Sequence, residues 1–161
     1  MDEANLHPNL ADLAPLLGRW EGGGRGWYPT IDDFDYLEAV TFGHVGKPFL
    51  SYAQATRSLD GAPLHVESGY LRSPGDGRLE LVLAHPFGAA ELAEGTVQRH
   101  GDRIEVDLRS TTVATTASAK VVAEVRRHVV VEGDALRYRV AMAAVGRPLQ
   151  DHLEATLHRV G

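Results

Sequence analysis

The sequence predicts an all-β fold, a closed antiparallel up-and-down β-barrel of about ten strands with a short N-terminal helix. Three features lead to this prediction: apolar and polar residues alternate along several segments, glycine- and aspartate-rich turns separate these segments, and no long helical segment lies between them. Strict alternation is typical of strands with one wet face, and strands without crossover connections pair antiparallel. Closure into a barrel removes the edges of such a sheet, and a β-sandwich is the alternative that the same pattern allows.

The N-terminal helix is expected over residues 9–17, where the segment NLADLAPLL is amphipathic. Asn9 is a suitable N-cap residue, and Gly18 is placed to end the helix. Because Pro15 lies inside this segment and has no backbone N–H to donate, the helix should be short or kinked at that point.

The strands are clearest at residues 78–84, 103–109 and 136–142, where apolar residues recur at every second position. Turn sequences such as PGDG at residues 74–77 and EGD at residues 132–134 separate them. Extended to the whole chain, the pattern predicts ten strands, centred on residues 20–28, 36–44, 48–57, 64–73, 78–85, 90–98, 103–109, 120–131, 136–145 and 150–159. Residues 110–119 have the weakest pattern and are expected to form a loop or a mobile rim.

The chain has 161 residues, a length that fits one domain with a substantial core, here predicted to span residues 1–161. Its formal net charge of −6 argues against nucleic-acid binding, and the basic triplet at residues 126–128 is expected on a solvated face. No apolar run approaches the roughly 18 residues of a membrane helix. There are no cysteines, and the 8 histidines lack the HExxH spacing of zinc enzymes. Because the first residues are acidic rather than basic, we expect no secretory signal and a cytoplasmic location.

A glycine-rich motif opens the predicted first strand: Gly18, Trp20, Gly22 and Gly24 stand two residues apart, and YPTI follows at residues 28–31. Glycines at this spacing share one face of a strand, which can then bend sharply or allow another backbone or a flat ligand to approach. The simplest interpretation is a barrel corner, with Trp20 plugging the closed end. The spacing is not that of a dinucleotide-binding loop, and no helix follows it to receive a phosphate.

This motif, together with the segments at residues 44–54 (HVGKPFLSYAQ), 64–72 (LHVESGYLR) and 146–159 (GRPLQDHLEATLHR), resembles the nitrobindin family. The segments occur in the order of that family and cover nearly the whole chain. The resemblance implies a barrel like that of fatty-acid-binding proteins, holding one ferric haem b per chain. It also implies an enzyme that isomerises peroxynitrite to nitrate and binds nitric oxide at the same iron.

The resemblance assigns the central role to His152, which matches the proximal haem ligand of nitrobindins and would be both metal ligand and catalytic residue. A neutral imidazole nitrogen is a common axial ligand of haem iron. Regular alternation, however, places His152 on the same face as Glu154 and opposite Leu153 and Ala155. Either several polar residues also line the interior, or the register slips at a β-bulge beside His152.

Five further residues match haem-contacting positions of the family. Leu64, His65 and Met142 would lie beside the haem, although Leu64 and His65 point to opposite faces of a regular strand and can both face the cavity only if the strand is distorted. Thr41 and Lys120 would lie close to the haem at the barrel mouth, where the propionates need donors or cations.

Two other functions remain open from the residues alone. One is a lipocalin-like or fatty-acid-binding-protein-like carrier of an apolar small molecule, although no interior arginine–tyrosine cluster for a carboxylate is evident. The other is a nitric oxide sensor without turnover. Residues 29–35 are too few for the helical lid of fatty-acid-binding proteins, so the mouth should be open. The expected partners are small molecules, without nucleic acid or membrane, and a homodimer through barrel strands is compatible with the sequence.

Overall fold

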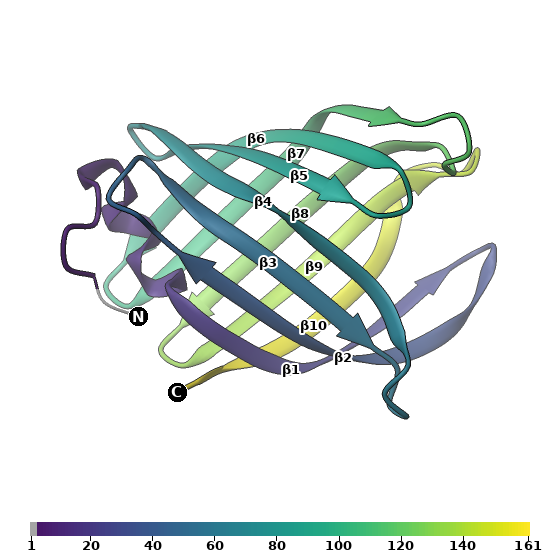
Figure 1. Ribbon diagram of the computed structural model, residues 1–161, viewed down its shortest axis with the longest axis horizontal. Helices are drawn as coiled ribbons and strands as arrows, with labels where there is room; N and C mark the ends of the chain where they lie inside the picture. The colour runs from purple at the N-terminus through teal and green to yellow at the C-terminus, as the bar shows by residue number, and fades with distance from the viewer. Residues whose placement is uncertain (1–2) are drawn as a thin grey trace.

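A computed structural model describes residues 3–161 of the chain as ten β-strands preceded by one short helix (Figure 1). In chain order the elements are η1 (Pro8–Leu16), β1 (Gly18–Tyr28), β2 (Ile31–Gly43), β3 (Phe49–Arg57), β4 (Pro63–Gly75), β5 (Arg78–His85), β6 (Ala89–His100), β7 (Arg103–Thr115), β8 (Val122–Glu132), β9 (Ala135–Ala144) and β10 (Gln150–Val160). The predicted fold class, an all-β protein with one short N-terminal helix, is confirmed.

The strands form a closed barrel in which each strand pairs antiparallel with its neighbours in the chain. The barrel closes where β1 pairs with β10, for example at Trp20 opposite Arg159 and Gly24 opposite Ala155. This arrangement leaves no sheet edge open. A closed barrel is therefore present, and not the β-sandwich that the sequence also allowed. Among the described residues, no helix has the length and apolar character needed to cross a membrane.

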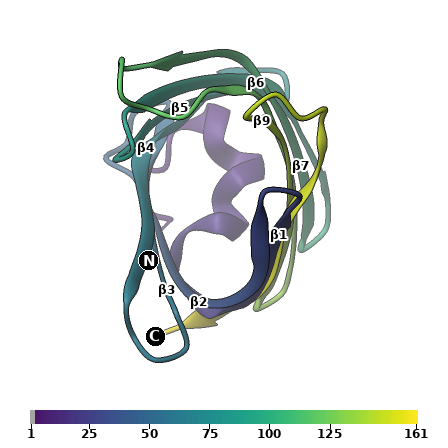
Figure 2. The same ribbon diagram turned by 90° about the vertical axis from the view of Figure 1, so that its right-hand side faces the viewer.

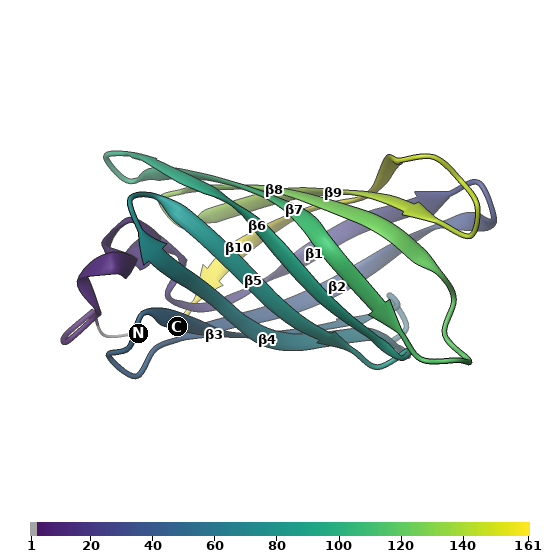
Figure 3. The same ribbon diagram turned by 90° about the horizontal axis from the view of Figure 1, so that it is seen from above.

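The two ends of the barrel differ. The helix η1 lies across one end, together with the turns that follow β2, β4, β6 and β8 (Figures 1 and 3). The other end carries the turns that follow β1, β3, β5, β7 and β9, and Figure 2 looks into the barrel from this end with the helix behind. We call these the closed end and the open end.

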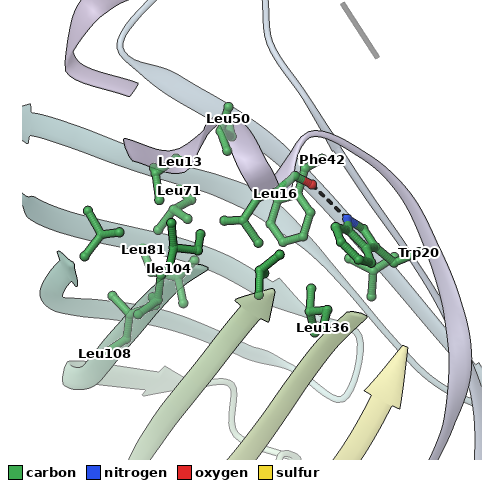
Figure 4. Packing of buried hydrophobic residues seen from close by; sticks show 14 of the residues in the cluster. Leu13, Leu16, Trp20, Phe42, Leu50, Leu71, Leu81, Ile104, Leu108 and Leu136 are labelled. Atoms are coloured by element: carbon green, nitrogen blue, oxygen red, sulfur yellow. Dashed lines mark hydrogen bonds between the residues drawn. The ribbon is translucent and has the colours of Figure 1, made fainter. Parts of the chain in front are cut away.

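The closed end is filled by an apolar core centred on Trp20, which is fully buried (Figure 4). Its indole Nε1 donates a hydrogen bond to the carbonyl of Leu16 at 2.8 Å, and the Arg159 guanidinium lies over the ring, 4.3 Å from its centroid. Leu10 and Leu13 of η1 are also fully buried against this cluster. Trp20 therefore plugs the closed end, as the sequence predicts.

The helix differs in detail from its prediction. It is a 3-10 helix, and its N-cap is His7, whose Nδ1 accepts a hydrogen bond from the Asn9 backbone N–H at 3.1 Å. Asn9 instead lies inside the helix and donates from its side chain to the Ser73 carbonyl at 3.1 Å. The Asn9 side chain thus bonds to a strand far away in the sequence and does not cap the helix. The local sequence alone does not indicate this partner.

Two strand boundaries also differ from the prediction. β7 continues to Thr115, so only residues 116–121 connect it to β8, because pairing with β6 outweighs the weak local pattern. β2 begins at Ile31, so only Pro29 and Thr30 separate it from β1. The open end therefore has no helical lid after the first strand, in agreement with the expectation of an open mouth.

The glycines of the first strand leave room for aromatic rings inside the barrel. A Cβ atom at Gly24 would lie 2.5 Å from the Tyr36 ring, and one at Gly26 would lie 2.3 Å from the ring of Phe34. Tyr36 and Phe34 are the cross-strand partners of these glycines on β2, and their rings lie 5.9 Å apart. The glycine face is thus occupied by rings of the neighbouring strand, which then form part of the cavity wall.

The ladder of hydrogen bonds is irregular mainly toward the open end. Register shifts occur in β1 against β2 around Trp27, in β3 against β4 around Thr56, in β6 against β7 beside Leu92 and in β10 against β9 at His152. A further shift lies at the start of β8, and the remaining one, next to Gly75, lies at the closed end. Bulges change the direction of side chains and are frequent at barrel rims and beside functional sites. Their concentration here indicates that a functional site lies toward the open end.

Candidate functional site

A cavity of about 530 Å³ lies inside the barrel between the closed-end core and the open end. Toward the open end its wall is mainly apolar, with Phe87, Val113, Val122, Val140 and Met142 among the lining residues. Deeper positions carry polar side chains from several strands, among them Glu38, Tyr52, Glu67, His85, Glu91, Arg127 and Tyr138. The cavity therefore combines an apolar mouth with a charged, hydrogen-bonded interior.

His152 reaches this cavity because β10 bulges at that residue. Asp151 pairs with Ala141 of β9 and Leu153 pairs with the next residue, Val140, so His152 is the extra residue of the ladder. Both His152 and Leu153 line the cavity, whereas Glu154 is exposed. Of the two possibilities left open by the sequence, the slipped register is correct. A regular strand would have needed a row of polar residues inside the barrel.

The imidazole of His152 is held in one orientation. Its Nδ1 donates a hydrogen bond to the carbonyl of Trp27 at 2.9 Å, which leaves Nε2 as the unprotonated nitrogen of the neutral ring. The ring meets Tyr28 edge-on, with centroids 5.4 Å apart and an interplanar angle of 78°. The Tyr28 hydroxyl is anchored to β9, where it accepts from the Ala144 N–H at 2.9 Å and lies 3.1 Å from the Met142 carbonyl.

Burial lowers the pKa of His152, and the positive charge of Lys120 acts in the same direction, whereas the hydrogen bond to Trp27 partly opposes them. The ring is therefore neutral at neutral pH. No described residue forms a hydrogen bond with Nε2. A neutral imidazole with its Nδ1–H on a backbone carbonyl and a free Nε2 is the usual state of a metal-binding histidine.

The structure brings most of the other predicted residues to the same cavity. Leu64, His65, Lys120 and Met142 all line it. Leu64 and His65 do so together because β4 is distorted there: the Thr56 hydroxyl bridges both the N–H and the carbonyl of His65, at 3.0 and 3.2 Å. Lys120 stands in the connection between β7 and β8, with its ammonium 5.3 Å from the Phe87 ring centroid.

Thr41, unlike the other predicted residues, is not among those that line the cavity. Its neighbours Val40 and Phe42 are buried and line the cavity, so regular alternation along β2 directs Thr41 to the outer face. β2 is regular at this point, where Thr41 pairs with Arg19 and Ala53, and no bulge turns its side chain inward.

The basic triplet at residues 126–128 is also not wholly solvated. Arg127 points into the barrel, with 14% of its side chain exposed, and forms a two-pronged ion pair with Glu91, in which the Nη2–Oε1 distance is 3.0 Å. The carboxylate of Glu67 lies 3.8 Å from the same guanidinium, and the Tyr52 hydroxyl donates to Glu67 at 2.7 Å. An interior arginine–tyrosine cluster therefore exists, contrary to the sequence-based expectation.

The sequence contained a signal for these interior residues. Arg127 lies two residues from both Val125 and Val129, and therefore on the same face of its strand. His85 likewise continues the inward-facing series of Leu79, Leu81 and Leu83. Extending the apolar alternation into polar residues would have placed them inside. Their partners come from other strands, so the ion pairs themselves could not be anticipated from one segment.

Two of the buried carboxyl groups, those of Glu67 and Glu91, are ionised. Burial raises the pKa of Glu67, but the hydrogen bond from His65, the charge of Arg127 and the hydrogen bond from Tyr52 outweigh burial and lower it to about 2. Glu91 is likewise ionised, since His85 and Arg127 overcome its burial and lower its pKa. Both carboxylates are therefore negative at neutral pH.

Glu38 behaves differently, because burial is the largest influence on it and raises its pKa to about 7. Its Oε2 accepts hydrogen bonds from Tyr138 at 3.0 Å and Gln54 at 3.2 Å. Its Oε1 is buried with no hydrogen-bond partner among the described residues. A proton on Glu38 would remove the buried negative charge, which explains the direction of the shift.

The fold and the cavity are those of a ligand-binding β-barrel, with an oriented, neutral histidine in the cavity wall. The profile of the THAP4-like, heme-binding beta-barrel domain matches residues 9–159, and the chain belongs to this family, as its resemblance to nitrobindins indicates.

Named relatives agree with this assignment. The chain is 59% identical to "Peroxynitrite isomerase 1" of Mycolicibacterium paratuberculosis, over 96% of this chain and 97% of that protein. It is 50% identical to "Peroxynitrite isomerase" of Nocardia farcinica, over 96% of this chain and 92% of that protein. The crystal structure of Rv2717c from M. tuberculosis superposes with a TM-score of 0.95 at 52% identity, covering 97% of this chain and 99% of that one.

Proposed function

We propose that this chain is a haem-dependent peroxynitrite isomerase in which His152 holds the iron of one haem b per chain. The observation that carries the proposal is the orientation of His152 in the cavity, with Nδ1 on the Trp27 carbonyl and Nε2 free. Relatives that share 50–59% of the sequence carry the name peroxynitrite isomerase, and the family is one of haem-binding barrels.

The residues around His152 suit a planar cofactor with an apolar body and charged edges. Met142, Val140 and Phe87 offer an apolar wall, and Tyr28 keeps the imidazole edge-on against β9. Lys120 is exposed at the rim and supplies a cation for a propionate. The donor set therefore fits haem, for which a histidine imidazole is a common protein ligand.

When bound, ferric haem would supply the iron chemistry that converts peroxynitrite to nitrate. The two anions have the same atoms and the same charge, so the overall reaction needs no second substrate and no net proton. The chain has correspondingly simple tasks: His152 anchors the cofactor, the apolar wall excludes water, and Lys120 attracts anions to the mouth. We further propose that nitric oxide binds at the same site.

The carrier alternative is disfavoured by the state of the interior cation. Arg127 could bind a fatty-acid carboxylate only by leaving Glu91, with which it shares two hydrogen bonds, and the nearby Glu67 is also negative. A nitric oxide sensor without turnover would use the same residues as the enzyme. Only the rate of peroxynitrite consumption distinguishes the two.

The test is a hemin titration of the purified protein followed by stopped-flow measurement of peroxynitrite decay. We expect a ferric Soret band that saturates at one hemin per chain, and a decay rate that rises in proportion to the haem-loaded protein, with nitrate as the product. His152→Ala should abolish stable haem binding while circular dichroism shows an intact barrel.

The matched control is His158→Ala, which removes an exposed histidine from the same strand. This variant should keep the Soret band and the decay rate. An unchanged Soret band in His152→Ala would contradict the ligand assignment. A haem-loaded protein that leaves peroxynitrite decay unchanged would favour the sensor, and a protein that ignores hemin would favour the carrier.

A further inference from the structure

A second cluster of metal-binding side chains lies in the cavity wall, separate from His152. It consists of His65 and Glu67 on β4 and His85 at the end of the neighbouring strand β5. The His65 Nε2 lies 3.3 Å from Glu67 Oε2, and His85 Nδ1 lies 3.4 Å from each of these two atoms. We propose that these three residues form a binding site for a divalent transition-metal ion, with zinc the best match.

The distances between the three atoms are those of a metal site. Ligands held about 2.05 Å from a tetrahedral zinc ion lie about 3.3 Å from one another, because the tetrahedral angle fixes the ratio of the ligand–ligand to the metal–ligand distance. The three observed separations of 3.3, 3.4 and 3.4 Å agree with this edge length. Two histidines and one glutamate with a fourth position open to a small ligand form a common zinc donor set.

The hydrogen bonds around the cluster direct lone pairs toward its centre. His85 donates from Nε2 to the ionised Glu91 at 3.0 Å, so in the neutral ring Nδ1 carries the lone pair that faces Glu67 and His65. The Tyr52 hydroxyl donates to the outer oxygen of Glu67 and leaves Oε2 for the centre. A carboxylate behind a histidine ligand is the usual outer shell of a zinc site, where it sets the tautomer and raises the basicity of the ring.

A proton on His65 Nε2 can hold the three atoms together by hydrogen bonding, and a metal ion would take the place of this proton. Arg127 does not fill the centre of the cluster. Its guanidinium lies 3.8 Å from Glu67 Oε2, but its two-pronged ion pair is with Glu91. The side chains of Glu67 and His85 are only 10% and 9% exposed, so bulk water competes little for their ligand atoms. All three candidate ligands line the cavity, which gives an ion and a fourth ligand access from the open end.

A second cluster on the barrel exterior does not meet these conditions. His128 Nδ1 lies 2.6 Å from Asp107, a hydrogen-bond distance that already places a proton between them, and Glu105 completes the group. Its side chains are 32–63% exposed, so water satisfies the remaining oxygens. This exterior cluster therefore serves as the control.

The test counts zinc and iron in the intact protein. Haem-loaded protein is dialysed to equilibrium against a zinc-buffered solution, and both metals are quantified per chain by mass spectrometry. We expect one zinc in addition to one iron. His85→Gln and Glu67→Gln should each weaken zinc binding by more than about 100-fold, since loss of outer-shell partners alone costs 10–100-fold. Circular dichroism and the more exposed His65→Gln guard against variants that lose zinc by unfolding.

Two further variants separate this inference from the proposed haem function. His152→Ala should lose iron and keep zinc, whereas His128→Gln should keep both. One zinc per chain that is lost with His65, Glu67 or His85 and retained in these two variants supports the proposal. A wild-type protein without zinc, or zinc that persists in both His85→Gln and Glu67→Gln, overturns it whatever the outcome for haem.

Discussion

The two ends of the barrel are built from the same alternating strands but serve different purposes. At the closed end, Trp20 and the leucines of η1 fill the interior completely, and the ladders there are almost regular. At the open end, bulges interrupt the ladders, and one of them aims His152 into the cavity. The difference shows that regular pairing produces a packed core, whereas local irregularity produces a site.

Between the two ends lies a layer of buried charges, which belongs to neither. Arg127, Glu91 and Glu67 come from three different strands and balance one another across the interior. Buried ion pairs rarely stabilise more than apolar packing would, but the loss of one partner is costly. Substitutions at successive levels of the barrel axis test whether stability and ligand binding are separated along it.

The largest expected effect on stability is at the closed end. Trp20→Ala removes a fully buried ring together with its hydrogen bond to Leu16 and its contact with Arg159. We expect the free energy of unfolding in urea to fall by about 3–5 kcal/mol, the usual cost of such a truncation. Hemin affinity, measured on the folded variant, should remain unchanged. A parallel loss of hemin affinity would show that the two ends are coupled.

The next effect concerns the buried charge layer. Glu91→Gln leaves the Arg127 guanidinium in the interior with only the more distant Glu67 carboxylate as counter-charge. We expect the free energy of unfolding to fall by about 3 kcal/mol. The control is Glu94→Gln, an exposed position on the same strand, which should change stability by less than about 0.5 kcal/mol. Equal effects of the two variants would mean that the interior ion pair is not essential.

A smaller, pH-dependent effect is expected at Glu38. Its pKa rises from 4.5 to about 7 on folding, so the folded protein binds this proton more tightly than the unfolded chain does. The associated stability is fully present below pH 4.5 and is lost as the pH rises to about 7. Between pH 5 and pH 8, wild type should therefore lose on the order of 2 kcal/mol more stability than Glu38→Gln. Parallel pH profiles of the two proteins would contradict an elevated pKa.

The smallest effect is expected at the open end. Tyr28→Phe removes the hydroxyl that joins β1 to β9 behind His152 and leaves the Ala144 N–H without its partner. We expect a stability loss of about 1 kcal/mol and a several-fold weaker hemin affinity, because the imidazole is less firmly oriented. Hemin titration and urea unfolding of the same sample measure both. A change in stability alone would show that Tyr28 does not position the ligand.

Much of the fold could be predicted from the sequence, because alternation and turn residues are local signals. Leu79, Leu81 and Leu83 identify a strand and its inner face without reference to the rest of the chain. Alternation between Val40 and Phe42 likewise directs Thr41 outward, whereas its expected contact with the haem came from a family position. Local alternation fails for residues 110–115, where pairing with β6 extends β7 beyond its own weak pattern.

By itself, the sequence determined the barrel, the number of its strands and the helix at one end. Through its family motif it also led to the proposal of His152, among 8 histidines, as the haem ligand. Only the tertiary structure decided the direction of the His152 side chain, since a bulge depends on register against β9 and shifts with it. The structure likewise decided the partners of Arg127 and brought His65, Glu67 and His85 within ligand distance of one another. Side-chain direction within a strand is a local property, but contacts across a barrel depend on closure and register, which involve strands far apart in the chain.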